Sequence, residues 1–270
     1  VTFTVEPTCT VSSSDDTPFV RPSDTPVVEN AYYWVGGAVG ENSRLAFSAT
    51  AGKWSLSDGG EPIADFVPGE GDTAVFTSAG VNLYANNVAA NIRALADVSF
   101  YNHDTKNDYV MSGDLYIEAG ATLSIKAIKG HSLTQTGAVV GSGTLRVYAE
   151  VMSSTANING DTSAFAGDVK FVVGGNNTLA SCRIGNVAAA NNALSSWNVF
   201  LTENSIVPYR DSTRTGYTAF PLSDTTYRFG ALNAVVSYPD KAPANSTFVI
   251  GGRDNEDSSV YGQFQSGGNT

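Results

Sequence analysis

The segment YNHDTKND (101–108) holds the side chains best suited to acid–base chemistry. It places His103 close to Asp104 and Asp108, and His131 is the only other histidine in the chain. A histidine that is oriented by a carboxylate can act as a general base. No nucleophile stands in a recognisable motif with it, so a triad is not indicated. The segment is better interpreted as a solvated turn between strands.

Other carboxylates are spread along the chain instead of forming one motif. The acids that a glycan-cleaving site could use are Asp97, Asp114, Glu118, Asp161 and Asp168. Cleavage of a glycosidic bond requires two carboxyl groups at a defined separation. Stacked strands could bring some of these acids together, but their spacing assigns no catalytic residue. We therefore expect no enzymatic activity and no cofactor.

A short acidic loop, GGRDNEDSSVYG, has the oxygen-rich composition of a calcium site. It carries Asp254, Glu256 and Asp257. Calcium requires several oxygen ligands on a tight turn, yet the spacing matches neither an EF-hand nor a glycine–aspartate nonapeptide. We expect a solvated acidic turn and no metal site.

The two cysteines, Cys9 and Cys182, lie far apart in the sequence. A disulfide between them would pin the beginning of the chain to its body, and an exported protein permits such a bond. Two buried free thiols are the alternative. Because the sequence does not give the Cα separation, both interpretations stay open.

Aromatic residues that could stack on sugar rings are Tyr32, Tyr33, Trp34, Trp54 and Trp197. For Trp34 and Trp54 we favour packing at the end of the fold, because the open end of a stacked β-structure must be covered.

These side chains sit on a succession of short predicted strands. Apolar residues alternate with polar ones, and Gly, Asn or Asp marks most boundaries, which is the pattern of half-buried strands. The predicted strands are 72–78, 81–85, 96–102, 108–113, 114–120, 121–127, 143–149, 167–174, 197–203, 226–232 and 246–252. Two alanine-containing segments, 85–97 and 186–197, lack convincing caps and are predicted to be non-helical.

The first residues, VTFTV, predict a strand with one buried face formed by Val1, Phe3 and Val5. A segment with four prolines and many Ser, Thr and Asp residues follows it, up to residue 30, and is typical of an extended connector. Such a strand can be donated to the sheet of a neighbouring chain. Docking as an edge strand on its own domain is the simpler alternative.

Composition excludes several classes of function. The chain has 270 residues and a formal net charge of -11. Nucleic acids bind through Lys and Arg at phosphates, so an acidic chain without a basic cluster disfavours them. No apolar run approaches the roughly 20 residues of a membrane helix, so we expect no membrane insertion.

Many short strands can form a sandwich, a barrel or a solenoid. Uniform strand length, short turns and repeated units such as GATLSI, GTLRVY and GDVKFV favour a solenoid, in which inward side chains form continuous apolar rows. In PGEGDTAVF, Pro68 and Gly69 fit a turn that leads into a strand. A phosphate-binding loop would require a following helix, and the sequence predicts a strand there, so the turn is the favoured interpretation.

The order of motifs from residue 31 to 266 resembles the passenger repeats of bacterial autotransporter-type proteins. The order begins with Trp34, Gly36-Gly37 and Trp54-Ser55 and continues with PGEGDTAVF. The later motifs are NIRALADVSF, DYVMSGDLYIEAGATLSI, GSGTLRVYAE and TSAFAGDVKFVVGG, in that order. The resemblance implies a right-handed parallel β-helix exposed on the cell surface, and it implies no reaction. It covers no part of the chain before residue 31.

We thus expect an all-β protein, a right-handed parallel β-helix (β-solenoid) over residues 31–270 with an extended N-terminal arm, residues 1–30. The expected function is that of a non-enzymatic, extracellular structural or adhesive module on the bacterial cell surface. Its expected partners are copies of itself, assembled into a filament or array through the arm, and host or environmental glycans. The alternative is a glycan-binding or glycan-cleaving β-helix.

Overall fold

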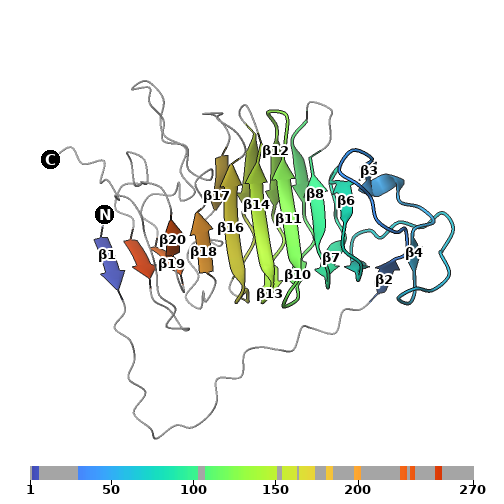
Figure 1. The fold of residues 1–270 in the computed structure, drawn as a ribbon, viewed down its shortest axis with the longest axis horizontal. Helices are drawn as coiled ribbons and strands as arrows, with labels where there is room; N and C mark the ends of the chain where they lie inside the picture. The colour runs from blue at the N-terminus through green and yellow to red at the C-terminus, as the bar shows by residue number, and fades with distance from the viewer. Residues whose placement is uncertain are drawn as a thin grey trace, which may run out of the picture.

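The computed structural model describes residues 2–5, 30–102, 107–150, 154–162, 164–173, 181–184, 198–201, 226–229, 232–234 and 247–250. This part of the chain is all-β, and its strands pair in parallel with one exception. The strands lie side by side along the long axis of the molecule (Figure 1). The only helix among the described residues is the 3-10 turn η1 (Phe47–Ala49), so none of these residues forms a helix able to cross a membrane.

The strands form four sheets. The sheet of eight contains, in spatial order, β20 (Leu232–Ala234), β18 (Asn198–Leu201), β16 (Asp168–Val173), β14 (Thr144–Ala149), β11 (Thr122–Ala127), β8 (Val98–Tyr101), β6 (Val81–Tyr84) and β3 (Leu45–Ala46). The sheet of six contains β13 (Val139–Gly141), β10 (Leu115–Ile117), β7 (Asn91–Ala94), β5 (Thr73–Phe76), β2 (Ala31–Trp34) and β4 (Trp54–Ser55). The sheet of four contains β17 (Ser181–Ile184), β15 (Thr155–Ile158), β12 (Ser132–Gln135) and β9 (Tyr109–Met111). The sheet of three contains β1 (Thr2–Val5), β21 (Thr247–Ile250) and β19 (Thr226–Phe229).

Strand order follows a simple rule in the middle of the chain. From β7 to β12 each strand pairs in parallel with the third strand after it: β7 with β10, β8 with β11, β9 with β12, and so on up to β12 with β15. Each passage of the chain through the three larger sheets therefore lies directly against the next passage.

The core is built from columns of identical or similar side chains. On β11 the inward residues are Leu123, Ile125 and Ala127, and they lie opposite Leu145, Val147 and Ala149 of β14. All six are fully buried. One core cluster contains residues of the three larger sheets, because a strand with period-2 alternation buries only one face and needs the other sheets to cover it.

Glycines stand where successive passages of the backbone come closest. A Cβ on Gly137 would lie 2.3 Å from the carbonyl oxygen of Gly113, and one on Gly160 would clash with the carbonyl oxygen of Gly137. No side chain fits in this column, which explains why glycine recurs at these turns.

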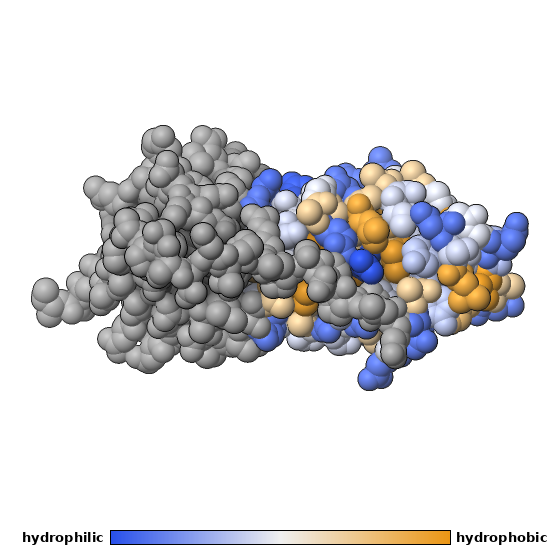
Figure 2. Space-filling view, turned by 90° about the horizontal axis from the view of Figure 1, so that it is seen from below, coloured by the Kyte–Doolittle hydropathy of each residue, from blue (hydrophilic) through white to orange (hydrophobic). Residues whose placement is uncertain are grey.

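The end of the molecule that contains β2 is packed with aromatic rings around an antiparallel strand pair, unlike the parallel aliphatic columns of the middle. Strand β4 pairs antiparallel with β2, with Trp34 opposite Trp54. The two indole rings meet edge to face at a centroid distance of 5.2 Å, and Phe76 packs on both. Figure 2 shows that hydrophobic residues also reach the surface at this end, where Leu56 is 71% exposed.

Every strand predicted from the sequence contains an observed strand, and the non-helical prediction for 85–97 is confirmed, since β7 lies there. Residues 186–197 lie outside the described residues. The sequence did not predict the short or polar strands β2, β3, β4, β7, β12, β13, β15, β17 and β20. These strands carry few alternating apolar residues, so their position is set by pairing with neighbours instead of by local pattern.

Candidate functional site

The first candidate site is the sheet edge that receives the N-terminal strand. Strand β1 pairs in parallel with β21 of its own chain, in the register Thr2 opposite Thr247 and Val5 opposite Ile250. Strand β21 in turn pairs with β19. The strand predicted from VTFTV is thus formed, and it docks on its own chain. Val1, and the connector from residue 6 to 29, lie outside the described residues.

Strands β1 and β2, which are neighbours in the sequence, lie at opposite ends of the long axis (Figure 1). Strand β1 is therefore the edge strand of the sheet of three at one end, and β2 belongs to the sheet of six at the other end. The backbone hydrogen bonds that hold β1 do not depend on which copy of the chain supplies the strand.

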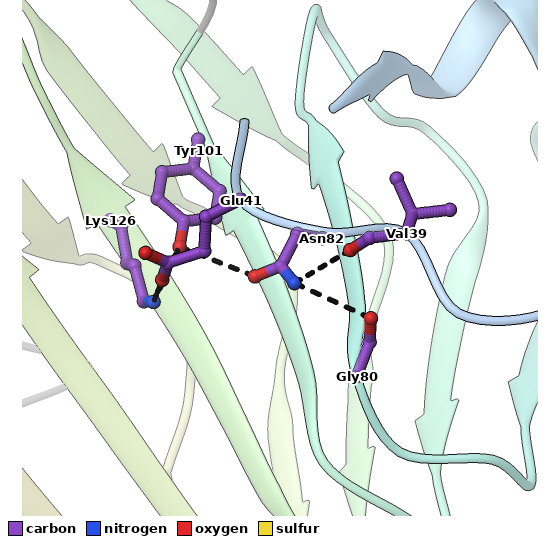
Figure 3. A network of polar contacts seen from close by, with 6 residues as sticks. All are labelled: Val39, Glu41, Gly80, Asn82, Tyr101 and Lys126. Atoms are coloured by element: carbon purple, nitrogen blue, oxygen red, sulfur yellow. Dashed lines mark hydrogen bonds and ion pairs between the residues drawn. The ribbon is translucent and has the colours of Figure 1, made fainter. Parts of the chain in front are cut away.

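The second candidate site is a polar cluster on the outer face of the sheet of eight (Figure 3). Lys126 Nζ donates to Tyr101 Oη at 2.6 Å and to Glu41 Oε1 at 3.1 Å. Tyr101 Oη donates to Glu41 Oε1 at 2.5 Å and lies 3.2 Å from Asn82 Oδ1. Asn82 Nδ2 donates to the carbonyl oxygen of Val39 at 2.7 Å. The cluster ties the loop before β3 to strands β6, β8 and β11.

Burial and hydrogen bonding shift the pKa values of this cluster. Burial lowers the pKa of Lys126, whose side chain is 9% exposed, and the neighbouring Glu41 opposes that change. Burial, and then the hydrogen bond to Glu41, raise the pKa of Tyr101. Hydrogen bonds from Tyr101 and Lys126 lower the pKa of Glu41. At neutral pH the shifts of Glu41 and Tyr101 therefore favour a carboxylate beside a neutral phenol.

A cavity of about 170 Å³ opens beside this cluster. Its far wall comes from β14 and the residue after it, namely Arg146, Tyr148 and Glu150. Arg44, from the loop before β3, also lines it and lies over the Tyr101 ring at 4.2 Å. The lining is polar and charged, with two tyrosine rings.

Three of the carboxylates singled out in the sequence have partners of their own in the structure. Asp97 and Asp114 accept backbone N–H groups of the next passage, from Thr122 at 2.7 Å and Ala138 at 2.7 Å. Glu118 pairs with Arg93 at 2.8 Å. Asp161 and Asp168 follow turns at Gly160 and Gly167, and Asp168 begins β16. These contacts stabilise turns between passages.

The histidine cluster is only partly described. Asp108 accepts the backbone N–H of Ser132 at 2.7 Å, which lowers the pKa of Asp108, and its carboxylate lies 4.0 Å from His131 Nδ1. His103 and Asp104 lie outside the described residues. Within the described part of the chain, no group of three His, Cys, Asp or Glu side chains could hold a metal ion. The acidic loop with Asp254, Glu256 and Asp257 also lies outside that part.

The predicted packing role of the tryptophans is confirmed for two of them. Trp34 and Trp54 are 2% and 0% exposed, so neither ring is available to a sugar. Tyr32 packs on Phe66 with ring centroids 4.3 Å apart, and Tyr33 lies opposite Ser55. Trp197 lies outside the described residues.

Cys182 is a free, buried thiol, and its Sγ lies 3.3 Å from the carbonyl oxygens of Val147 and Val172. Burial raises its pKa to about 12. Cys9 lies outside the described residues, so both interpretations of the cysteine pair, a disulfide and two free thiols, stay open.

The outer-face cluster was not predicted from the sequence. Lys126, Arg146 and Tyr148 fall within the predicted strands 121–127 and 143–149, where their local sequence marks no site. The alternation of the strand does show that Ser124 and Lys126 share its outward face. The structure adds that Lys126 lies opposite Tyr101 and Tyr148 on that face. Glu41 and Arg44 come from a loop, so only the folded chain shows that they join this face.

Comparison with protein-family models, with curated proteins and with solved structures found no match.

Proposed function

We propose that this chain is a right-handed parallel β-helix that works as a non-enzymatic structural module and assembles with copies of itself. The β-helix is supported by the regular pairing of strands β7 to β12, each with the third strand after it, and by one core shared among three sheets. Such stacks derive their stability from contacts between neighbouring passages, which suits a rigid, elongated building block.

The observation that carries the proposal is the parallel pairing of β1 with β21, at the end of the molecule opposite β2. An N-terminal strand that is linked through a 6–29 connector can leave its own β21 and occupy β21 of another copy, which is a form of domain swapping. The contact is heterologous, since β1 of one copy meets β21 of the next. Where each copy donates its strand to a further copy, and two copies do not exchange strands with each other, repetition of the contact gives an open filament or array.

The opposite end supports the direction of assembly. There β4 pairs antiparallel with β2 and the Trp34–Trp54–Phe76 cluster fills the interior. A covered edge does not template further strands. We therefore assign assembly to the strand-donating arm and not to end-on stacking of bare strands.

The location we propose is the outside of a bacterial cell. It is supported by the resemblance of residues 31–266 to surface-exposed passenger repeats and by the net charge of -11, which favours solubility. Adhesion is the accompanying role, and the further inference below concerns a surface that would serve it.

The test compares the full chain with a variant that lacks residues 1–30. The full chain is expected to form species larger than the 28.2 kDa protomer, with a size that rises with concentration in light scattering and with filaments or arrays in electron micrographs. The truncated chain is expected to keep its β-sheet circular dichroism and to remain monomeric. Assemblies that persist unchanged after the deletion contradict the proposal, as does a full chain that is monomeric at every concentration.

A peptide competition covers the case in which the truncated chain does not fold. A synthetic peptide of residues 1–5, VTFTV, is added to the full chain during assembly. It is expected to shorten the assemblies, because it pairs with β21 in place of β1. A peptide with the same five residues in scrambled order is the control. Equal effects of the two peptides contradict strand donation.

A further inference from the structure

The outer-face cavity has a composition that points to a ligand. Arg44, Lys126 and Arg146 supply three cations, and Glu41 and Glu150 supply two carboxylates. The local formal charge is thus positive by one unit, on a chain whose net charge is -11. A local cation excess in an acidic protein concentrates a small anion at that place.

The cations are not all neutralised within the protein. Lys126 Nζ has three donors, of which Tyr101 Oη and Glu41 Oε1 accept two. Arg44 Nε is buried and has no hydrogen-bond partner among the described residues. Arg146 lies over the Tyr148 ring at 5.2 Å, and no described carboxylate forms an ion pair with it. Donors therefore remain available at this cavity.

The shape and the two carboxylates restrict the ligand further. A volume of about 170 Å³ lies below the 300–1,000 Å³ of pockets for drug-sized ligands, so it suits a single ring. Glu41 and Glu150 would repel a multiply charged anion, but their oxygens can accept hydrogen bonds from hydroxyl groups. The Tyr148 ring adds an apolar surface beside these polar groups.

We propose that this cavity binds one acidic sugar residue, a singly charged pyranose carboxylate such as a uronic acid unit of a larger glycan. Arg146 holds the sugar carboxylate, Lys126 and Arg44 add donors, and Glu150 accepts from the ring hydroxyls. The site gives the adhesive role a ligand class and a place on the molecule. It goes beyond the strand exchange proposed above and does not depend on it.

The test is calorimetric titration of the full chain at low ionic strength, where screening of charges is weak. The probes are glucuronic acid, glucose and inorganic sulfate. Saturable binding of glucuronic acid is expected, with glucose and sulfate weaker by about tenfold or more. Glucose lacks the charge-assisted contact, which is worth about 1.4 kcal/mol or more, a factor of ten. Sulfate carries two charges, which Glu41 and Glu150 repel, and it offers no ring hydroxyl groups to Glu150. No saturable binding of glucuronic acid overturns the proposal, and so does equal binding of glucose or of sulfate.

Two variants locate the site. Arg146→Gln is expected to weaken glucuronic acid binding by about tenfold. Lys170→Gln is the matched control, since Lys170 lies opposite Arg146 in the next strand but does not line the cavity, and it is expected to leave the affinity within about twofold. Equal losses in both variants, or no loss in Arg146→Gln, overturn the assignment. Both variants retain β1 and β21, so normal assembly with lost sugar binding separates this proposal from the assembly proposal.

Discussion

The aromatic end and the repeating middle of this molecule reach the same burial by different means. At the end around β2 and β4, large rings of Trp34, Trp54 and Phe76 fill the interior around one antiparallel pair. In the middle, around β11 and β14, aliphatic residues lie opposite one another in register. An end has no next passage to cover it, so it requires bulk, whereas the middle requires repetition.

The largest effect that would test this difference is expected from Trp54→Ala. Trp54 is fully buried and its Nε1 donates to Thr50 Oγ1 at 2.9 Å. Removal of a buried Trp side chain costs about 3–5 kcal/mol of stability. Because a stacked fold can open locally, we expect the loss at this end, as amide hydrogen exchange faster by about a hundredfold or more in β2 and β5.

The exchange of the middle strands is the internal reference for that variant. Strands β11 and β14 are expected to keep their protection in Trp54→Ala. Leu56→Ala, at a side chain that is 71% exposed, is the control and should change stability by less than about 0.5 kcal/mol. If the end and the middle lose protection together, the two regions form one cooperative unit and the distinction drawn between them is wrong.

Gly137→Ala probes the repeating middle and is expected to have an intermediate effect. A Cβ there would lie 2.3 Å from the carbonyl oxygen of Gly113 and 2.5 Å from its carbon. The backbone must shift to relieve this contact, and forced overpacking costs about 1–3 kcal/mol. Chemical denaturation followed by circular dichroism measures the loss.

Gly69→Ala is the matched control for the glycine column. Its Cβ would approach nothing nearer than Asp72 Oδ2 at 4.0 Å, so the exchange of Gly for Ala should be neutral or slightly stabilising. A Gly137→Ala variant as stable as the Gly69→Ala variant would show that the passages are not packed as closely as the structure has them.

The same contrast explains what the sequence could predict. In the middle, strands such as β11 and β14 were predicted because each carries its own alternation, as in Leu123 and Ile125 or Leu145 and Val147, and this alternation is local information. Strand β4, with two residues, has no such pattern, and it forms because Trp54 packs into the open end. Its antiparallel pairing with β2 is a tertiary effect.

Each candidate site also has a part that the local sequence predicts and a part that only the fold shows. The strand in VTFTV was predicted from five residues, but its partner β21 is almost the whole chain away, so only the fold identifies it. The outer-face cavity joins Arg44 of a loop to Lys126 and Arg146 of two paired strands. Parallel register brings Lys126 and Arg146 to one face, and nothing in the local sequence shows that the loop covers it.

The smallest effect is expected from Glu41→Gln, which tests how firmly the aromatic end is tied to the middle. Glu41 reaches from the loop before β3 to Lys126 of β11, with 63% of its side chain exposed. An exposed partner is screened by solvent, so we expect a loss below about 1 kcal/mol at neutral pH. The loss should decrease at high salt, and Glu61→Gln, at an exposed carboxylate, is the control.

The pH dependence gives that small effect a sign. The pKa of Glu41 is lowered in the folded chain from its ordinary value of 4.5, first by the hydrogen bond from Tyr101 and then by Lys126. A carboxylate with a lowered pKa stabilises the fold above its ordinary pKa, and this stabilisation is lost as the pH falls through the lowered value. The difference between the natural chain and Glu41→Gln, measured by denaturation at a series of pH values, should therefore be constant near neutrality and vanish in acid. A difference that grows on acidification would show that the carboxylate is not the bonded form, and the link between the two regions would then rest on Tyr101 and Asn82 alone.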